Sequence, residues 1–413
     1  KHLPVLQKDL TQGSVTKNLI KFSLPFLLSN LIQAFYSVTD MLIVGWYSGE
    51  AGISGVAIGS QVTLLVTNFV VGFTVGGTVL VAQYFGAKRE HDVRETIGTL
   101  FTLLIIVAAV MTFLFITFAE PILKLLNTPN ESFSNAKGYL NICMLGTVFI
   151  FGYNAVASIL RGLGDSKRPL YFVTIACVLN VGLDFLMVGA FKMSSAGAAV
   201  ATVIAQGVSL ILSVGYLNKN NFIFDFKLKS FGIRKDKLLR IFRIGLPSSV
   251  QNIVVSLSFL VMTALANRLG VDASAALGIV GKFNGFAILP AIAMSSSISS
   301  MAGQNLGAGQ PERAKQTMWV GMRIAFAVSA VIFALVQIFP QFVLRIFSDK
   351  PEVISAGVDY IHTFSFDFLF IPFLFCFNGL IIGSGHSMFS MLIGVTSSVL
   401  LRIPLAILFG FVL

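Results

Sequence analysis

A few ionisable side chains stand inside otherwise apolar stretches of this sequence, and they are the residues that could do chemistry. They are Asp40, Asp184, Lys282, Asp367 and Arg402. A charged group in an apolar environment is costly, so each of these side chains needs a physical reason to be there.

The two aspartates of the first half have polar companions at helical spacing. Asn180 precedes Asp184 by four residues, and Ala198 precedes Thr202 by four residues, so each pair shares one face of a helix. Carboxylate, amide, hydroxyl and backbone oxygens suit Na⁺, and a carboxylate can instead hold a proton. Two carboxylates in one dry pocket cannot both stay ionised without a cation. Together with Asp40, these residues predict a site for H⁺ or Na⁺. The alternative is that each aspartate only caps or bridges helices.

The residues for other kinds of chemistry are not arranged for it. Cys143, Cys177 and Cys376 each stand in an apolar run, without disulfide or zinc spacing. The four histidines are far apart, and no phosphate-binding G-x-x-x-x-G-K-[ST] motif occurs. We therefore expect neither an enzyme nor a bound metal, and no cofactor apart from H⁺ or Na⁺ at the acidic site.

The composition indicates what kind of protein must position these residues. Residues of the set AVILMFWYC make up 55% of the 413 residues and charged residues only 11%, against about 25% charged in a soluble domain. With a mean hydropathy of +0.85, this is an integral membrane protein. Its long apolar runs indicate helices, since the strands of an outer-membrane barrel have about ten residues. The net charge of +11 comes without a separate basic tract, so we expect no nucleic-acid partner.

Eleven apolar stretches are candidate membrane spans. They cover approximately residues 17–45, 52–82, 94–119, 134–160, 169–190, 194–217, 238–269, 273–303, 316–346, 353–382 and 386–411. Several exceed the roughly 20 residues that cross a bilayer, so we expect tilted or kinked helices. Glycines four residues apart predict close helix packing. These pairs are Gly55 and Gly59, Gly72 and Gly76, and Gly281 and Gly285.

Lysine and arginine are distributed unevenly between alternate loops. Of the 29, 21 fall on the side of the N-terminal segment and of the long polar stretch 218–237, six on the opposite side, and two inside spans. Positively charged loops stay in the cytoplasm. We therefore expect a multi-pass protein of a bacterial inner membrane with its N-terminus in the cytoplasm.

The sequence repeats itself at a nearly constant offset. The matching residues are Pro25 in KFSLPFLLSN and Pro247 in RIGLPSSVQN, Gly86 in QYFGAKRE and Gly307 in QNLGAGQPER, and Gly162 in LRGLGDSKRP and Gly383 in IIGSGHS. A repeat of six spans, an even number, makes the two repeats parallel. We predict an all-α membrane protein with an N-lobe over 1–217 (helices 1–6), a cytoplasmic linker loop over 218–237, and a C-lobe over 238–413 (helices 7–11). The second half holds five spans, so we also expect a twelfth helix that this sequence does not include.

Several of these motifs carry a resemblance to a known family. LPFLLSNLIQAFYSVTD, ILRGLGDSKRP, LNVGLDFLMVG with GAAVATVIAQ, and RIPLA closely resemble the multidrug and toxic compound extrusion (MATE) transporters, in particular their DinF-like branch. The resemblance covers nearly the whole chain. It implies two six-helix lobes that form a V, rocker-switch alternating access, and export of organic cations in exchange for H⁺ or Na⁺.

The resemblance also implies functional roles for residues of the N-lobe. Residues similar to the cation-coupling site are Asp40, Asn180, Asp184 and Thr202, with Tyr139 and Asn154 as its hydrogen-bonded neighbours. Residues similar to the substrate contacts are Gln33, Tyr36 and Asp40. The NorM-like branch has a Glu on the seventh span, eight residues after the proline, where this chain has Val255. This difference favours H⁺ over Na⁺ as the coupling ion.

We therefore expect a secondary active multidrug exporter that works as a monomer, with small lipophilic cationic drugs and membrane lipid as its partners. The alternative is a flippase for a lipid-linked precursor of the same superfamily. A flippase would bind an anionic pyrophosphate and need several cationic side chains in its cavity, whereas the spans hold only Lys282 and Arg402. These two can pair with Asp367, a possible cavity residue, and we interpret Arg402 as structural. A channel would need a continuous polar filter or a charged ring, and none is visible.

Overall fold

The computed structural model describes residues 8–268, 271–346 and 351–408, and within these ranges every regular element is a helix. The first part contains α1 (Val15–Gly86), α2 (Glu90–Thr117), α3 (Ala119–Leu125), α4 (Asn130–Leu145), α5 (Thr147–Gly162), α6 (Lys167–Asp184), the π-helical η1 (Phe185–Ala190) and α7 (Ser194–Lys219). After the 3₁₀ turn η2 (Leu228–Ser230) come α8 (Lys235–Arg268), α9 (Val271–Ala287), α10 (Leu289–Gly307), α11 (Pro311–Ile338), α12 (Pro340–Arg345), α13 (Pro351–Phe364), α14 (Asp367–Gly383), α15 (Ser387–Thr396), the π-helical η3 (Ser397–Arg402) and α16 (Ile403–Ile407). The prediction of an all-α protein is confirmed.

These helices provide eleven membrane spans in the described part of the chain. Eight helices are long and apolar enough to cross a membrane, and two bent pairs, α4 with α5 and α13 with α14, add one span each. The helix α1 counts twice, because its 72 residues would extend about 108 Å at 1.5 Å per residue, and a bilayer core is about 30 Å thick. Gly49 interrupts it with φ 64° and ψ −161°, a conformation that glycine adopts readily. The predicted twelfth helix concerns residues outside this sequence.

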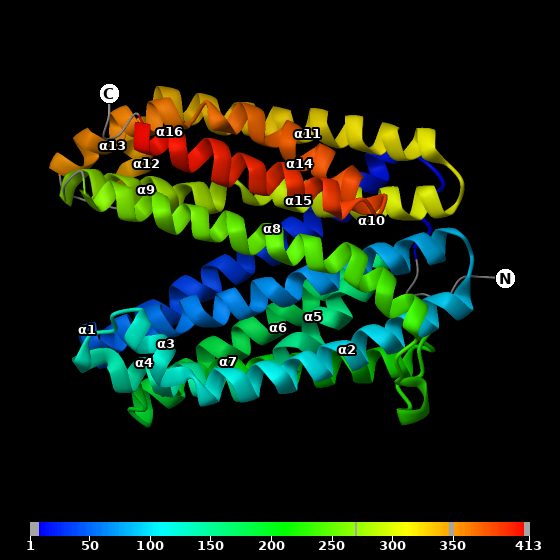
Figure 1. The fold of residues 1–413 in the computed structure, drawn as a ribbon, viewed down its shortest axis with the longest axis horizontal. Coiled ribbons are helices and arrows are strands. Elements are labelled where there is room, and N and C mark those ends of the chain that lie inside the picture. Colours follow the sequence, from blue (N-terminus) through cyan, green and yellow to red (C-terminus); the bar gives the residue numbers. More distant parts are fainter. Residues whose placement is uncertain (1–7, 269–270, 347–350, 409–413) are drawn as a thin grey trace.

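The spans form two lobes that diverge as a V (Figure 1). Helices α1 to α7 make the lower lobe of the view, and α8 to α16 make the upper one. The lobes lie closest at the right, near the loops that follow α1, α7 and α10, and they separate toward the left. We call this right-hand end the basic end. It contains residues 8–14 and the loops 87–89, 163–166, 220–234 and 308–310.

Glycines let the two lobes touch backbone to backbone in the half of the molecule near the basic end. A Cβ on Gly72 of α1 would lie 2.5 Å from the backbone nitrogen of Ser249 on α8, and one on Gly76 would lie 2.8 Å from the Ile241 carbonyl. The Ser249 hydroxyl also donates a hydrogen bond to the Phe69 carbonyl at 2.5 Å. This packing agrees with the spacing of Gly72 and Gly76 in the sequence.

The first helix of the N-lobe begins against the other lobe. Leu19 and Phe22 of α1 are buried in one apolar cluster with Ile298 and Met301 of α10 and Met322 of α11. The N-lobe's own core is a separate and larger cluster that includes Phe73, Leu100 and Phe151.

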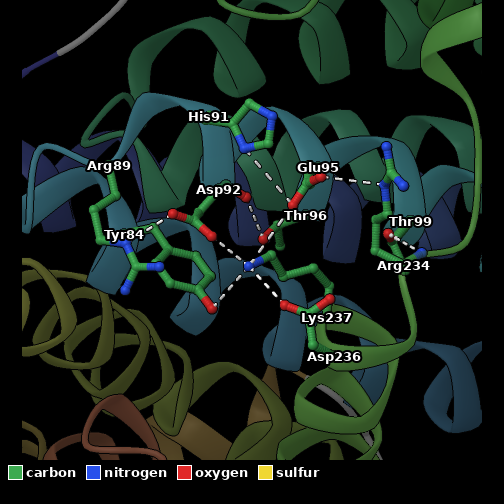
Figure 2. Close-up of polar contacts among 10 residues, drawn as sticks. All are labelled: Tyr84, Arg89, His91, Asp92, Glu95, Thr96, Thr99, Arg234, Asp236 and Lys237. Carbon is green, nitrogen blue, oxygen red and sulfur yellow. Dashed lines mark hydrogen bonds and ion pairs between the residues drawn. The ribbon is translucent and has the colours of Figure 1, made fainter.

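The first turn of α8 is in turn fastened to the N-lobe by a polar cluster (Figure 2). The ammonium of Lys237 contacts the Asp92 carboxylate, lies 3.9 Å from Glu95, and lies 3.3 Å from the Tyr84 hydroxyl. Its side chain is only 3% exposed. Arg234 adds an ion pair with Glu95 at 3.1 Å. The end of the linker and the start of α8 are therefore held against α2.

Aromatic packing holds the rest of the linker on the same helix. Phe224, Phe226 and Phe231 surround Phe101 of α2, with ring centroids 5.8 to 6.2 Å from it. The linker is thus a packed part of the N-lobe surface.

Candidate functional site: the acidic cluster of the N-lobe

The two aspartates of the N-lobe lie side by side. Asp40 is on the first half of α1, and Asp184 is the last residue of α6, where that helix widens into η1. The two carboxyl groups are close enough to interact directly. Asp40 is 5% exposed and Asp184 is fully buried. The fold thus brings two acids that are far apart in the sequence into one dry site.

Thr202 of α7 connects these acids to their polar neighbours. Its hydroxyl oxygen accepts a hydrogen bond from the Tyr36 hydroxyl at 2.8 Å and another from the Asn180 amide at 3.4 Å. The Asp40 carboxyl group is a further neighbour of this hydroxyl. Three helices, α1, α6 and α7, therefore meet at one hydroxyl group.

Four oxygens of this cluster accept no hydrogen bond from the described residues. They are Oδ1 of Asp40, Oδ1 of Asn180 and both carboxylate oxygens of Asp184. Buried polar atoms are almost always paired, so unpaired ones call for an explanation such as a bound ion or a proton. The donor set consists of hard oxygens with excess negative charge, and it fits H⁺ or Na⁺.

Tyr139 lies beside the acidic cluster, and Gly59 makes room for it. A Cβ on Gly59 of α1 would lie 2.7 Å from the ring of Tyr139, which is on α4. The Tyr139 phenol is 6% exposed and lies near Asp40 and Tyr36. The thiol of Cys143 is another neighbour of this phenol.

Asn154 is placed differently from what the resemblance implies. Its side-chain amide donates to the Ile150 carbonyl of its own helix at 2.8 Å, and among the described residues it makes no hydrogen bond to the carboxylates of the acidic cluster. It lines a small pocket together with Gln33 and Tyr36. The structure therefore groups Asn154 with the expected substrate contacts.

That pocket has a volume of about 190 Å³ and adjoins the acidic cluster, since Tyr36 belongs to both. Its polar wall consists of Gln33, Tyr36, Ser37, Tyr153, Asn154, Cys177 and Gln206. Typical small-molecule sites have about 300–1,000 Å³. A pocket of this size holds one group of a drug-sized molecule, and all of its lining residues belong to the N-lobe.

Gln206 is a site residue that the sequence reasoning missed. It lines the pocket, and its side-chain carbonyl oxygen is buried and accepts no hydrogen bond from the described residues. It follows Thr202 by four residues, so the helical spacing that paired Asn180 with Asp184 also places Gln206 on the face of Thr202.

The ionisable residues of the C-lobe do not form a matching cluster. Arg402 donates to the Ser258 hydroxyl at 2.9 Å and lies 4.5 Å from the ring centroid of Phe259. Within the described residues, Asp367 makes no ion pair with Arg402 or with Lys282, which is exposed on α9. The possible pairing of these cations with Asp367 is therefore not seen as a direct ion pair.

The arrangement can hold one cation in exchange for another. Two buried carboxyl groups without a cationic side-chain partner in the described residues favour a proton, Na⁺ or a positively charged ligand. The neighbouring pocket offers aromatic faces and neutral polar groups to the body of such a ligand.

A family model described as MatE matches the chain twice, over residues 25–186 and 247–408. The two matches begin at Pro25 and Pro247, which confirms the internal repeat read from the sequence. Among curated relatives, the probable multidrug resistance protein YpnP of Bacillus subtilis is 29% identical over 97% of this chain and 90% of its own length. The FAD transporter of Shewanella oneidensis is 25% identical over 98% of this chain and 90% of its own length.

A solved structure described as the outward-facing conformation of a multidrug resistance MATE family transporter superposes with a TM-score of 0.92. It is 20% identical in sequence, and the match covers 99% of this chain and 91% of the other. This likeness confirms the two-lobe fold.

Proposed function

Because the chain belongs to the MatE family of membrane transporters, we propose that it is a secondary active multidrug exporter that exchanges lipophilic organic cations for H⁺. The observation that carries this proposal is the buried acidic cluster of Asp40 and Asp184, with unpaired oxygens, directly beside a polar and aromatic pocket. The relatives named as multidrug resistance proteins support the same role.

The charge of the site favours a cationic substrate. Two carboxyl groups attract a positive ligand, and the rings of Tyr36 and Tyr153 can contact a cation over their faces. When a cationic drug binds, its positive charge stabilises the ionised carboxylates, so the acids release their proton. The proton and the drug therefore compete, which is the requirement for exchange.

We favour H⁺ over Na⁺ as the coupling ion. A proton needs only one carboxylate, and here Asp40 and Asp184 are close enough to share it. Val255 stands on α8 where the NorM-like branch has an acid, so the C-lobe offers no second carboxylate at that position. The oxygens of Asn180 and Thr202 would also suit Na⁺, and the experiment below separates the two ions.

We further propose that the basic end faces the cytoplasm of a bacterial inner membrane and that the protein works as a monomer. In this orientation the V opens to the outside, and the N-terminal segment lies inside. A rotation of the two lobes about their contact would close the outer side and open the basic end. This rocker-switch motion would expose the site first to one side of the membrane and then to the other.

A flippase for a lipid-linked precursor is the second candidate. It would bind an anionic pyrophosphate group, for which the N-lobe site offers carboxylates of the wrong sign. In the C-lobe, Arg402 is already engaged with Ser258 and Phe259. These contacts disfavour the flippase.

The test is efflux from proteoliposomes with a pH gradient and a Na⁺ gradient imposed separately. Ethidium-like monocations should be exported with the pH gradient alone, and aromatic anions of equal size should not. Export driven only by the Na⁺ gradient would show that the coupling ion is Na⁺ and not H⁺. Preferential binding or transport of the anions would favour the flippase.

A further inference from the structure

Two glutamines at equivalent positions of the repeat join the lobes at the basic end. Gln83, near the end of α1, donates its amide to the Gly383 carbonyl of α14 at 3.0 Å. Gln304, near the end of α10, donates its amide to the Gly162 carbonyl of α5 at 2.9 Å. The two donors are separated along the sequence by the same offset as the two acceptors. The same hydrogen bond is thus made twice, once in each direction between the lobes.

The helix ends that carry these glutamines are in direct contact. A Cβ on Gly86 would lie 2.0 Å from the Gln304 carbonyl oxygen, and a Cβ on Gly307 would lie 2.0 Å from the Gln83 carbonyl oxygen. Such distances leave no space for a side chain, nor for water. We call Gln83 and Gln304 the glutamine pair.

The two members of the glutamine pair differ in one respect. Gln304 is fully buried, and its side chain makes a second hydrogen bond, in which Oε1 accepts from the backbone N–H of Leu10 at 3.0 Å. The same N-terminal segment is bound to the N-lobe, where the Lys8 N–H donates to the Leu163 carbonyl at 3.0 Å. Gln83 is half-buried and makes one hydrogen bond to the other lobe.

We propose that the glutamine pair stabilises the state closed at the basic end, and thereby sets how often this end opens. The inference rests on the alternating access proposed above, because an open basic end separates α1 from α10 and α14. Opening exchanges both interlobe hydrogen bonds for bonds to water. A net hydrogen bond is worth about two- to tenfold in such an equilibrium.

The Lys237 cluster is not an equivalent device. Arg234 and the linker hold the first turn of α8 on α2, so this contact can travel with the N-lobe when the lobes rotate. The glutamine pair instead connects helix ends that lie in different lobes, and it has to break.

The test measures the distance between the lobes by pulsed electron spin resonance in nanodiscs, without drug and without an ion gradient. Spin labels are placed at Lys167→Cys in the N-lobe and Lys315→Cys in the C-lobe, both exposed at the basic end, after replacing the three native cysteines with serine. The variants are Gln83→Met and Gln304→Met, since Met matches Gln in length and forms no comparable hydrogen bond. Gln316→Met, at an exposed position of α11, is the matched control.

Gln83→Met should raise the ratio of long to short distances about two- to tenfold. Gln304→Met should raise it more, because two hydrogen bonds are lost. The double variant should raise the ratio at least as far as Gln304→Met alone, and the two effects need not multiply because neighbouring sites couple. The control should leave the distribution unchanged.

An unchanged distance distribution in Gln83→Met would overturn the proposal. If Gln304→Met does not fold, the result for Gln83→Met is sufficient by itself. A shift equal to that of the control would do the same. The readout is independent of the substrate. If the distance distribution shifts but the protein shows no ion-driven efflux, the proposed exporter function is refuted, whereas the role of the glutamine pair is supported.

Discussion

Replacing Asp40 by asparagine tests whether the acidic cluster couples ion movement to export. Asn keeps the shape of the side chain, but it can neither gain nor lose a proton. Its amide can also donate to Asp184, whose oxygens are otherwise unpaired within the described residues. We expect the variant to fold and to lose gradient-driven export.

The size of the effect follows from the burial of the site. Asp40 is 5% exposed, so its charge acts through protein and not through bulk water. At an effective dielectric constant of about 20, one unit charge about 6 Å from a cation contributes roughly 3 kcal/mol, which is about a hundredfold in affinity. Cation binding should therefore weaken by about that factor, and efflux should fall to the leak of empty liposomes.

The assay compares pH-driven efflux and equilibrium binding of an ethidium-like cation in the same preparation. Asp367→Asn is the matched control, because it removes an exposed carboxylate from the other lobe. That variant should retain most of its transport. Efflux by Asp40→Asn that still follows the gradient at the rate of the parent protein would refute the assignment, whichever ion is used.

Three further predictions concern the ion, the topology and the packing of the lobes. Asn180→Ala should reduce efflux driven by the coupling ion only a few-fold if that ion is a proton, whereas the loss should be nearly complete if it is Na⁺, which needs several oxygen ligands. A membrane-impermeant thiol reagent added outside cells should label Lys192→Cys and not Lys229→Cys in the linker. Labelling of Lys229→Cys and not of Lys192→Cys would show that the orientation in the membrane is opposite to the predicted one. Gly86→Ala should favour the state open at the basic end, because its Cβ would lie 2.0 Å from the Gln304 carbonyl, and the spin-label distances report this shift. Gly215→Ala, with nothing within 4 Å of its Cβ, should leave the distances unchanged and is the control.

The fold was predictable because the sequence signals behind it are local or periodic. Apolar runs give the spans, and the nearly equal offsets of Pro25 and Pro247 and of Gly86 and Gly307 give the two lobes. The length of the apolar runs predicted that some helices would be kinked, but it did not predict the positions of the kinks. The break at Gly49 depends on a backbone angle, and the bends of 53° and 48° join α4 to α5 and α13 to α14.

Glycine spacing was a weaker guide, because it predicts close packing without naming the partner. Gly55 and Gly59 contact α4, where a Cβ would lie 2.5 Å from Asn135 and 2.7 Å from Tyr139. Gly281 and Gly285 of α9 have the same spacing, yet no described atom lies within 4 Å of their Cβ positions. Close approach therefore depends on the surroundings of the glycines as well as on their spacing.

The candidate site was predictable to the level of residue types, and less so in its connections. Asp40 and Asp184 were identified as charged residues inside apolar stretches, and Asn180 was identified by its helical spacing from Asp184. The central position of the Thr202 hydroxyl requires three helices to converge, which no single segment encodes. Roles for Asp40, Asn180, Asp184 and Thr202 in ion coupling stay predictions until the variants above are measured.

The repeat separates two kinds of residue, and this separation bears on mechanism. Where the halves agree, as at the glutamine pair, the residues form the contact between the lobes. Where the halves differ, the ionisable groups of the candidate site occur in the first half only. The second half has Met262 at the position of Asp40 and Leu405 at the position of Asp184. In the proposed mechanism, an ion bound at the acidic cluster would therefore act on one lobe only. Its effect on the other lobe would have to pass through the contacts between them, which include the glutamine pair at the basic end.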